Sequence, residues 1–372
     1  MQRRMFLQSL AGAAALPVLA QAQQAPQPTF PPVDERSVWL VGDSAPADPV
    51  RLTARLAELT AKFDKARDGY LAGGAVEALE KRFASLLNKE SCVFLPTGSL
   101  ANHIAVRVLG GERSRILVQH ESHLYRDEYD AAQLLSGLNL VPLAKGQAQV
   151  TLEELKLAVD EAENGPHALK VGAMSIESPV RRHKGEMVEP ATMKNLAAFA
   201  REKNIRLHLD GARLLLAPPE FDRNAYVALF DTVYVSLYKY LGAPFGAVLA
   251  GSKADIDKAR ALRDRFGGTI YQGWISAVLA LGALDDFEAR IAKSHQAARK
   301  LFAAIDAKVK PNASGSNIYT LTLPPKIATG VFDRMREAGV RMQKPDANGN
   351  VDVYVNETIL RRPVDEIQKL FG

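Results

Sequence analysis

The sequence predicts an α/β protein with a three-layer αβα domain around a mainly parallel β-sheet, followed by a smaller C-terminal α+β domain. Two observations lead to this fold class. Short apolar segments with strand-like patterning repeatedly alternate with longer segments whose apolar residues recur every three or four positions. Such alternation is typical of right-handed crossovers between parallel strands. With 372 residues, the chain is also long enough for two domains.

The predicted elements follow one another in a regular order. Segments with strand-like patterning are 91–95, 116–120, 140–143, 170–177, 206–210, 230–238, 245–249, 317–323 and 351–355. Segments with helical periodicity are 49–65, 76–87, 98–109, 130–135, 151–163, 192–203, 253–265, 275–305, 326–338 and 364–371. We therefore expect a large domain with its N-terminal segment over residues 37–268. A connecting helix and the small domain follow over 269–372.

The N-terminal residues have the pattern of an export signal. Arg3 and Arg4 precede an apolar run over 10–19 that is too short to span a bilayer, and small residues follow it. Because the paired arginines resemble a twin-arginine signal, we expect residues 1–22 to direct export to the periplasm and to be removed. Residues 23–36, rich in Gln and Pro, are expected to form a disordered tail. A membrane anchor or an accidental apolar tail is the alternative interpretation.

Composition argues against several classes of function. The formal charge is only +5, and no Lys/Arg-rich run is interleaved with aromatic residues, so nucleic-acid binding is not expected. Cys92 is the only cysteine, which excludes an intrachain disulfide and a cysteine metal cluster. The apolar fraction of 47% and charged fraction of 24% are those of a soluble globular protein. We expect no stable membrane association once the signal is cleaved.

Several chemically informative residues follow predicted strands. In open α/β sheets, ligands bind beyond the carboxyl ends of the strands, where residues 97–99, His123, Asp210 and Lys239 all fall. Lys239 lies in a short turn between two strands, flanked by tyrosines. Burial there favours the neutral amine that Schiff-base chemistry requires. Taken by itself, this lysine fits a surface loop equally well.

The turn at residues 97–99 suits an anion. Thr97, Gly98 and Ser99 join a strand to a helix, so backbone N–H groups and the helix dipole face a ligand there. In isolation, Ser99 could instead be a helix cap. A phosphate site, a histidine, an aspartate and a lysine at one sheet edge together match the needs of pyridoxal 5′-phosphate (PLP).

Four motifs carry a family resemblance over roughly residues 38–372. They are Pro96-Thr-Gly-Ser-Leu-Ala-Asn102, Glu121-Ser-His123, His208-Leu-Asp-Gly-Ala-Arg213 and Lys239-Tyr-Leu-Gly-Ala-Pro244. In this order and spacing they resemble the threonine aldolase/β-eliminating lyase branch of the fold-type I PLP-dependent enzymes. The resemblance implies a fold-type I transferase-like fold, PLP as cofactor, an amino acid as substrate, and a homodimer or homotetramer.

The resemblance also implies roles for individual residues. Lys239 would be the Schiff-base lysine and proton shuttle, and Asp210 the partner of the pyridinium nitrogen. His123 would lie on the ring face. Arg213 would reach the cofactor oxygen or the substrate carboxylate. We expect His208 to be a structural histidine beside the site.

Further positions follow from the same resemblance. Gly98 and Ser99 would hold the cofactor phosphate, with Thr97 as an additional donor. Ser44 and Tyr70 loosely match N-terminal segments of the family and become candidate substrate-binding residues.

The chain departs from the family pattern at three positions that are expected to contact the substrate or the cofactor phosphate. Val180 stands where the second histidine is expected, Tyr271 where a basic phosphate partner is expected, and Asp352 where the carboxylate-binding arginine is expected. Arg181 or Arg182 could replace that arginine, since a guanidinium is the natural carboxylate clamp. The alternative is that both belong to a solvated basic turn.

The reaction expected from this pattern is cleavage of the Cα–Cβ bond of a threonine-like β-hydroxy amino acid to glycine and an aldehyde. Because of Val180, β-elimination or other Cα chemistry is the alternative within the class. A non-catalytic periplasmic protein that binds an amino acid or PLP is the alternative from another class. A metallohydrolase using His120 and His123 is weaker, because no third ligand has suitable spacing. We therefore expect no metal site.

Overall fold

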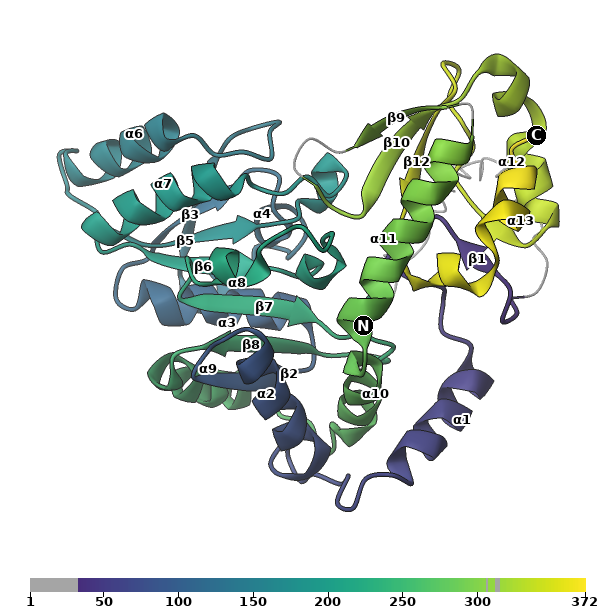
Figure 1. Ribbon diagram of the computed structural model, residues 1–372. Coiled ribbons are helices and arrows are strands. Elements are labelled where there is room, and N and C mark those ends of the chain that lie inside the picture. The colour runs from purple at the N-terminus through teal and green to yellow at the C-terminus, as the bar shows by residue number, and fades with distance from the viewer. Residues whose placement is uncertain (1–32, 306, 312–314) are drawn as a thin grey trace, which may run out of the picture.

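The computed structural model describes residues 33–305, 307–311 and 315–372. The expected signal at 1–22 and the expected tail, apart from its last residues, lie outside the described part of the chain. What is described consists of a large α/β unit and a smaller C-terminal unit, joined by a long helix that runs between them (Figure 1). Within this part of the chain, no helix is long and apolar enough to cross a membrane.

A seven-stranded sheet forms the centre of the large unit, with strand order β2-β8-β7-β6-β5-β3-β4. The strands are β2 (Ser91–Leu95), β3 (Arg115–Gln119), β4 (Asn139–Leu143), β5 (Val171–Glu177), β6 (Arg206–Asp210), β7 (Thr232–Ser236) and β8 (Ala247–Gly251). The pairs from β4 to β7 are parallel, whereas β8 is antiparallel to both β7 and β2. The predicted mainly parallel sheet is confirmed, with an antiparallel edge.

Helices cover both faces of this sheet (Figure 1). On one face, a large core cluster joins apolar residues of the sheet to α2 (Gly74–Leu86), α6 (Leu152–Glu163), α7 (Pro190–Glu202), α8 (Arg223–Val227) and α10 (Trp274–Leu284). On the other face lie α3 (Gly98–Gly110) and α9 (Lys253–Arg265), with α4 (His123–Arg126) and α5 (Ala131–Ser136) nearby. Because side chains alternate along a strand, Leu207 and Leu209 of β6 join the first face, and His208 and Asp210 point toward α3.

The C-terminal unit has its own core between a sheet and several helices. Its sheet has the order β12-β10-β9, formed by β9 (Lys308–Pro311), β10 (Ile318–Thr322) and β12 (Asn350–Tyr354), all antiparallel. The helices are α11 (Phe287–Ala304), α12 (Pro325–Glu337), the 3-10 helix η3 (Glu357–Arg361) and α13 (Val364–Lys369). The predicted smaller α+β domain is therefore present.

The structure corrects the boundary between the two units at the N-terminus. Strand β1 (Val38–Trp39), which we grouped with the large domain, pairs in parallel with β11 (Val340–Arg341) of the C-terminal unit. The buried Val38 and Leu40 belong to the apolar core of that unit. After this strand the chain crosses to α1 (Pro49–Thr60), which packs on α10. The N-terminal segment thus connects both units.

A second correction concerns the long helix predicted over residues 275–305. It is two helices, α10 and α11, separated by Asp285 in an extended conformation and Asp286 in the left-handed region with φ of 55°. Aspartate tolerates this region better than most residues because its short side chain bonds locally. Apolar periodicity continued across the break and therefore concealed it.

Candidate active site

One cavity of about 280 Å³ lies at the edge of the sheet where β5 and β6 end and where the loop after β7 returns. The residues singled out from the sequence that line it are Thr97, Gly98, Ser99, His123, Asp210, Arg213 and Lys239. Asn102, Glu177, Tyr234 and Tyr238 also face it. The structure therefore brings these residues together at one cavity.

The N-terminus of α3 forms one wall of this cavity. Thr97 caps the helix, since its Oγ1 accepts a hydrogen bond of 3.2 Å from the Leu100 N–H. The N–H groups of the first turn have no acceptor within the helix and can bind an anion. Gly98 is required by packing, because a Cβ at this position would lie 2.0 Å from Tyr234 Oη.

Asp210 ends β6 with both carboxylate oxygens held. Its Oδ1 accepts from the Ala212 N–H at 3.1 Å, and its Oδ2 accepts from Asn102 Nδ2 at 2.8 Å. The side chain is only 3% exposed. Both bonds fix the direction of this carboxylate, which lines the cavity.

Lys239 lies in the turn after β7, and its carbonyl oxygen accepts a hydrogen bond from Ser44 Oγ at 2.9 Å. Its Nζ lies 5.7 Å from the centroid of the Tyr238 ring. Burial lowers the pKa of Lys239, and the nearby Arg213 guanidinium lowers it further. Neutral amine is the nucleophilic form, so the site favours attack on a carbonyl carbon.

Arg213 is clamped by a carboxylate from the N-terminal segment. Its Nε and Nη2 donate to Asp43 Oδ1 and Oδ2 at 2.7 and 2.9 Å. Burial acts to lower the pKa of Arg213, but the carboxylates of Asp43, Glu177 and Asp210 together hold this pKa above its usual value. Among the described residues that line the cavity, Arg213 is the only arginine.

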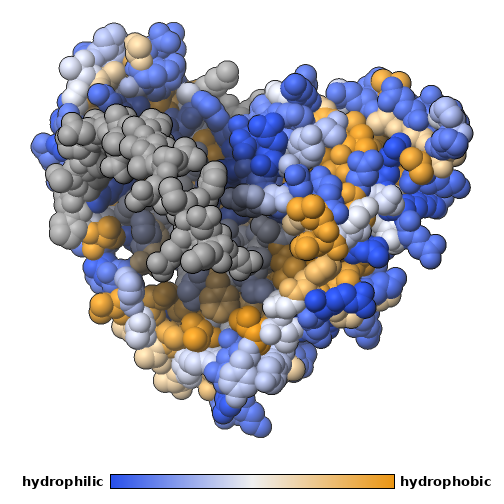
Figure 2. Space-filling view, turned by 180° about the vertical axis from the view of Figure 1, so that it is seen from behind, coloured by the Kyte–Doolittle hydropathy of each residue, from blue (hydrophilic) through white to orange (hydrophobic). Residues whose placement is uncertain are grey.

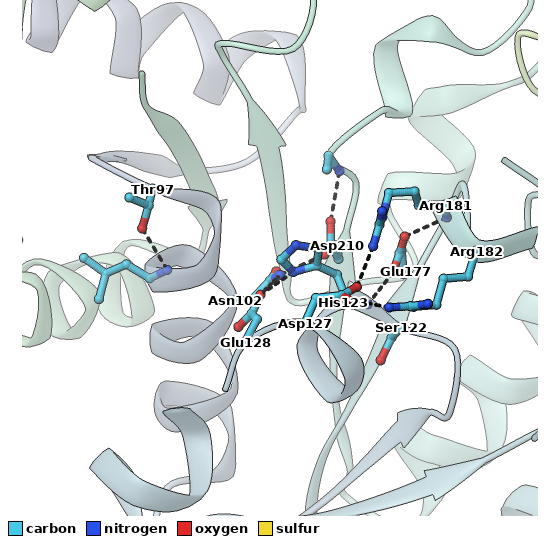
Figure 3. A network of polar contacts seen from close by, with 12 residues as sticks. Thr97, Asn102, Ser122, His123, Asp127, Glu128, Glu177, Arg181, Arg182 and Asp210 are labelled. Atoms are coloured by element: carbon cyan, nitrogen blue, oxygen red, sulfur yellow. Dashed lines mark hydrogen bonds and ion pairs between the residues drawn. The ribbon is translucent and has the colours of Figure 1, made fainter. Parts of the chain in front are cut away.

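His123 begins α4 and is held from two sides (Figure 3). Its backbone N–H donates to Glu177 Oε2 at 2.6 Å, and its Nδ1 lies 2.9 Å from Glu128 Oε1. The hydrogen bond to Glu128 raises the pKa of His123, and Asp210 and Glu177 add to this effect. Burial and the negative charge of Asp210 raise the pKa of Glu177 to about 7.

Asn102 joins the two sides of the site. It lies on α3, one turn after Gly98. Besides its bond to Asp210, Asn102 Nδ2 donates to Glu128 Oε1 at 2.9 Å. The Asn102 Oδ1 lies 3.0 Å from His208 Nε2. Sequence reasoning missed Asn102 and Glu128 as site residues. The i, i+4 spacing from Gly98 to Asn102 was a usable signal, because it puts both on one helix face.

His208 has the structural role expected of it. It is fully buried, with Nδ1 2.9 Å from Thr232 Oγ1 and Nε2 bonded to Asn102. Burial lowers the pKa of His208 to about 4, so the ring is neutral at neutral pH.

The four candidate substrate residues do not line the cavity. Ser44 Oγ donates hydrogen bonds to the backbone oxygens of Lys239 and Ala45, and Tyr70 is 64% exposed and packs edge-on against Tyr271. Arg181 and Arg182 both bind Asp127, at 2.7 and 2.5 Å. In the single chain, Arg181 and Arg182 therefore belong to a partly solvated basic turn, which was the alternative to carboxylate binding.

The departures from the family pattern have structural counterparts. Val180 is fully buried and does not line the cavity, so it supplies no polar group there. Asp352 accepts from Thr320 Oγ1 at 2.6 Å and lies 3.0 Å from Lys184 Nζ. In the described part of the chain, no group of three or more His, Cys, Asp or Glu side chains could hold a metal ion.

The residues present fit PLP. The helix N-terminus offers N–H donors for a phosphate, and Gly98 lets the Tyr234 ring approach this turn closely. Asp210 offers a fixed carboxylate to a ring nitrogen, His123 a planar ring, and Lys239 an amine with a lowered pKa. These groups match the phosphate, the ring nitrogen and the aldehyde of the cofactor.

Comparison with known proteins agrees with this site. Residues 51–319 match the family model described as beta-eliminating lyase. The low specificity L-threonine aldolase of Saccharomyces cerevisiae is 27% identical over 285 residues, which cover 75% of this chain and 73% of that protein.

Solved structures share the fold. A structure from Listeria monocytogenes described as a candidate L-allo-threonine aldolase superposes with a TM-score of 0.74 and 25% identity, covering 91% of this chain and 95% of that one. The serine palmitoyltransferase of Sphingomonas wittichii superposes with a TM-score of 0.64 at 17% identity, covering 90% and 86%, which shows the fold alone. The architecture is that of fold-type I PLP-dependent enzymes, and the chain belongs to the threonine aldolase/beta-eliminating lyase family.

Proposed function

We propose that this protein is a PLP-dependent lyase that cleaves the Cα–Cβ bond of a threonine-like β-hydroxy amino acid into glycine and an aldehyde. The observation that carries the proposal is the single cavity in which Lys239, Asp210, His123 and the N-terminus of α3 meet. The matching family model and the aldolase relatives support the same reaction.

The residues of the cavity divide the work of the reaction. When bound, PLP supplies a ring that accepts the electron pair released as the Cα–Cβ bond breaks. Asp210 would hold the proton of the cofactor's ring nitrogen through its fixed carboxylate, and Lys239 would offer its amine to the cofactor's aldehyde group. Arg213 binds the substrate carboxylate. The β-hydroxyl loses its proton as the aldehyde forms, and Cα gains a proton to give glycine.

The test begins with the cofactor. Purified protein reconstituted with PLP should show the near-visible absorption band of lysine-bound cofactor, and Lys239→Ala should lose this band while remaining folded. Wild-type protein without a band would overturn the cofactor assignment.

The substrate is tested on the same preparation. Release of acetaldehyde from threonine or allo-threonine, with equal amounts of glycine, is the expected result. If only pyruvate or an oxobutyrate and ammonia form from β-substituted amino acids, β-elimination is the reaction instead. If a panel of amino acids changes the cofactor spectrum without turnover, the protein is a binding protein.

We also propose export and assembly. The arginine pair and short apolar run near the N-terminus support export by a twin-arginine route, and fractionation of expressing cells should place mature protein in the periplasm.

Exposed apolar side chains support a homodimer or homotetramer: Tyr129 is 96% exposed, Leu134 78% and Tyr70 64%. Seen from behind, orange apolar residues gather across the lower half of the molecule (Figure 2). Light scattering should give at least twice the monomer mass.

A further inference from the structure

A chain of hydrogen bonds joins His123 to Asp210, which both line the cavity (Figure 3). It begins at His123 Nδ1, passes through Glu128 Oε1 at 2.9 Å and Asn102 Nδ2 at 2.9 Å, and ends at Asp210 Oδ2 at 2.8 Å. The described roles of the site use His123 and Asp210 but assign nothing to Glu128. This buried carboxylate is only 4% exposed.

The orientation of the Asn102 amide follows from its neighbours. Carboxylate oxygens only accept hydrogen bonds, so the side of the amide that faces Glu128 and Asp210 is the NH₂ group. Each of its two hydrogens then serves one carboxylate. The amide oxygen must accept from His208 Nε2, which leaves His208 Nδ1 to accept from the Thr232 hydroxyl. Burial raises the pKa of Glu128, whereas the hydrogen bonds from His123 and Asn102 to its Oε1 act in the opposite direction and favour the anion.

An ionised Glu128 determines the state of His123. Because Glu128 Oε1 accepts, the proton on the neutral His123 ring lies on Nδ1, and Nε2 is left as the basic atom. The other oxygen, Glu128 Oε2, is buried without a hydrogen-bond partner among the described residues. An imidazolium at His123 is therefore the counter-charge in direct contact with this carboxylate.

No other imidazole lines the cavity within the described chain. Both oxygens of Glu177 are engaged by the backbone N–H groups of His123 and Arg181. Proton transfer at a substrate hydroxyl needs a group with a free acceptor atom. Nε2 of His123 is such an atom.

We propose that Glu128 is a positioning residue that holds His123 with Nδ1 toward the protein and Nε2 toward the cavity, where Nε2 exchanges the proton of the substrate β-hydroxyl. The positioning stands on the contacts of the protein itself, and the last step rests on the proposed cleavage reaction. The charged groups that face His123 are Glu128, Asp210 and Glu177, while Arg213 and Lys239 line the same cavity. The carboxylates raise the pKa of His123.

The test uses NMR titration of the full-length protein without cofactor, labelled at its 7 histidines, with His123→Asn to assign the signal. In wild-type protein we expect His123 to titrate above the usual value of about 6.5 and its neutral form to carry the proton on Nδ1. Titration at or below that value, or a neutral ring protonated on Nε2, would overturn the proposal without any variant at Glu128.

Glu128→Gln removes the charge and keeps the shape of the side chain. We expect the pKa of His123 to fall by about one unit or more, since an opposite charge in contact shifts a pKa by roughly one to three units. In the holoenzyme, the rise of kcat with pH should move to lower pH by a similar amount, because the basic form of His123 is the active one.

Glu121→Gln is the matched control. Glu121 Oε1 lies 2.7 Å from Nδ1 of His120, a similar pair, but neither residue lines the cavity. This variant should leave the His123 titration and the pH profile unchanged. An unaltered His123 titration in folded Glu128→Gln would refute the positioning role even if the enzyme is an aldolase. A shifted titration in a protein without aldolase activity would refute only the proposed function.

Discussion

Gly98 offers the sharpest test of how packing shapes the phosphate end of the site. In Gly98→Ala, the added Cβ would lie 2.0 Å from Tyr234 Oη and 2.6 Å from Tyr234 Cζ, where ordinary contacts begin at 3.4 Å. Either Tyr234 or the N-terminus of α3 must therefore move by roughly 1 Å or more. Tyr234 is only 2% exposed and packs among apolar residues of β2, α3 and β8, so it has little room.

The expected cost follows from overpacking. Forcing an extra methyl group into a packed site costs about 1–3 kcal/mol. If the displacement falls on the helix N-terminus, the same energy appears as lost phosphate binding, and each 1.4 kcal/mol is a factor of about ten. We therefore expect Gly98→Ala to lower PLP affinity roughly ten- to a hundredfold and to lower the melting temperature of the cofactor-free protein.

The assay is an absorbance titration with PLP beside thermal unfolding of the cofactor-free protein. Gly69→Ala is the control, because no atom lies within 4 Å of the added Cβ and its φ is not in the left-handed region. Reduced stability with unchanged PLP affinity would refute the assignment of this helix N-terminus to the phosphate. Unchanged values for both would refute the packing argument itself.

Three further predictions concern the polar network. Asn102→Ala removes one hydrogen-bond partner each from Asp210, Glu128 and His208, and should lower the free energy of unfolding by about 3 kcal/mol or more in denaturant titrations; a change near zero would contradict its joining role. His208 has a pKa of about 4 when folded and about 6.5 when unfolded, so wild type loses stability as pH falls through this window. His208→Gln lacks this loss, and the difference in unfolding free energy between the two proteins should narrow by about 3 kcal/mol from pH 7 to pH 4. Asp43→Asn removes one side of the bidentate clamp on Arg213, and should raise KM with a smaller effect on kcat; the reverse pattern would show that Arg213 acts mainly in the transition state.

Local patterns in the sequence predicted most of the large domain. Strand and helix periodicity found the seven strands of the sheet, and the rule that ligands bind beyond strand ends brought residues 97–99, His123, Asp210 and Lys239 together in advance. This worked because burial on both sheet faces produces strong apolar runs. The break at Asp285 and Asp286 was missed, because backbone dihedrals change there without a change in apolar periodicity.

What the sequence determined by itself is the set of residues with the chemistry for PLP, because each follows a strand or begins a helix. Only the tertiary structure decided how these residues are held. Contacts between distant segments, such as Asp43 with Arg213 and Asn102 with Asp210, have no local signal in the chain. The same is true of Glu128, whose effect on His123 depends on burial and on an amide from another helix. Side-chain identity supplies the reacting groups, and packing sets their charge and direction.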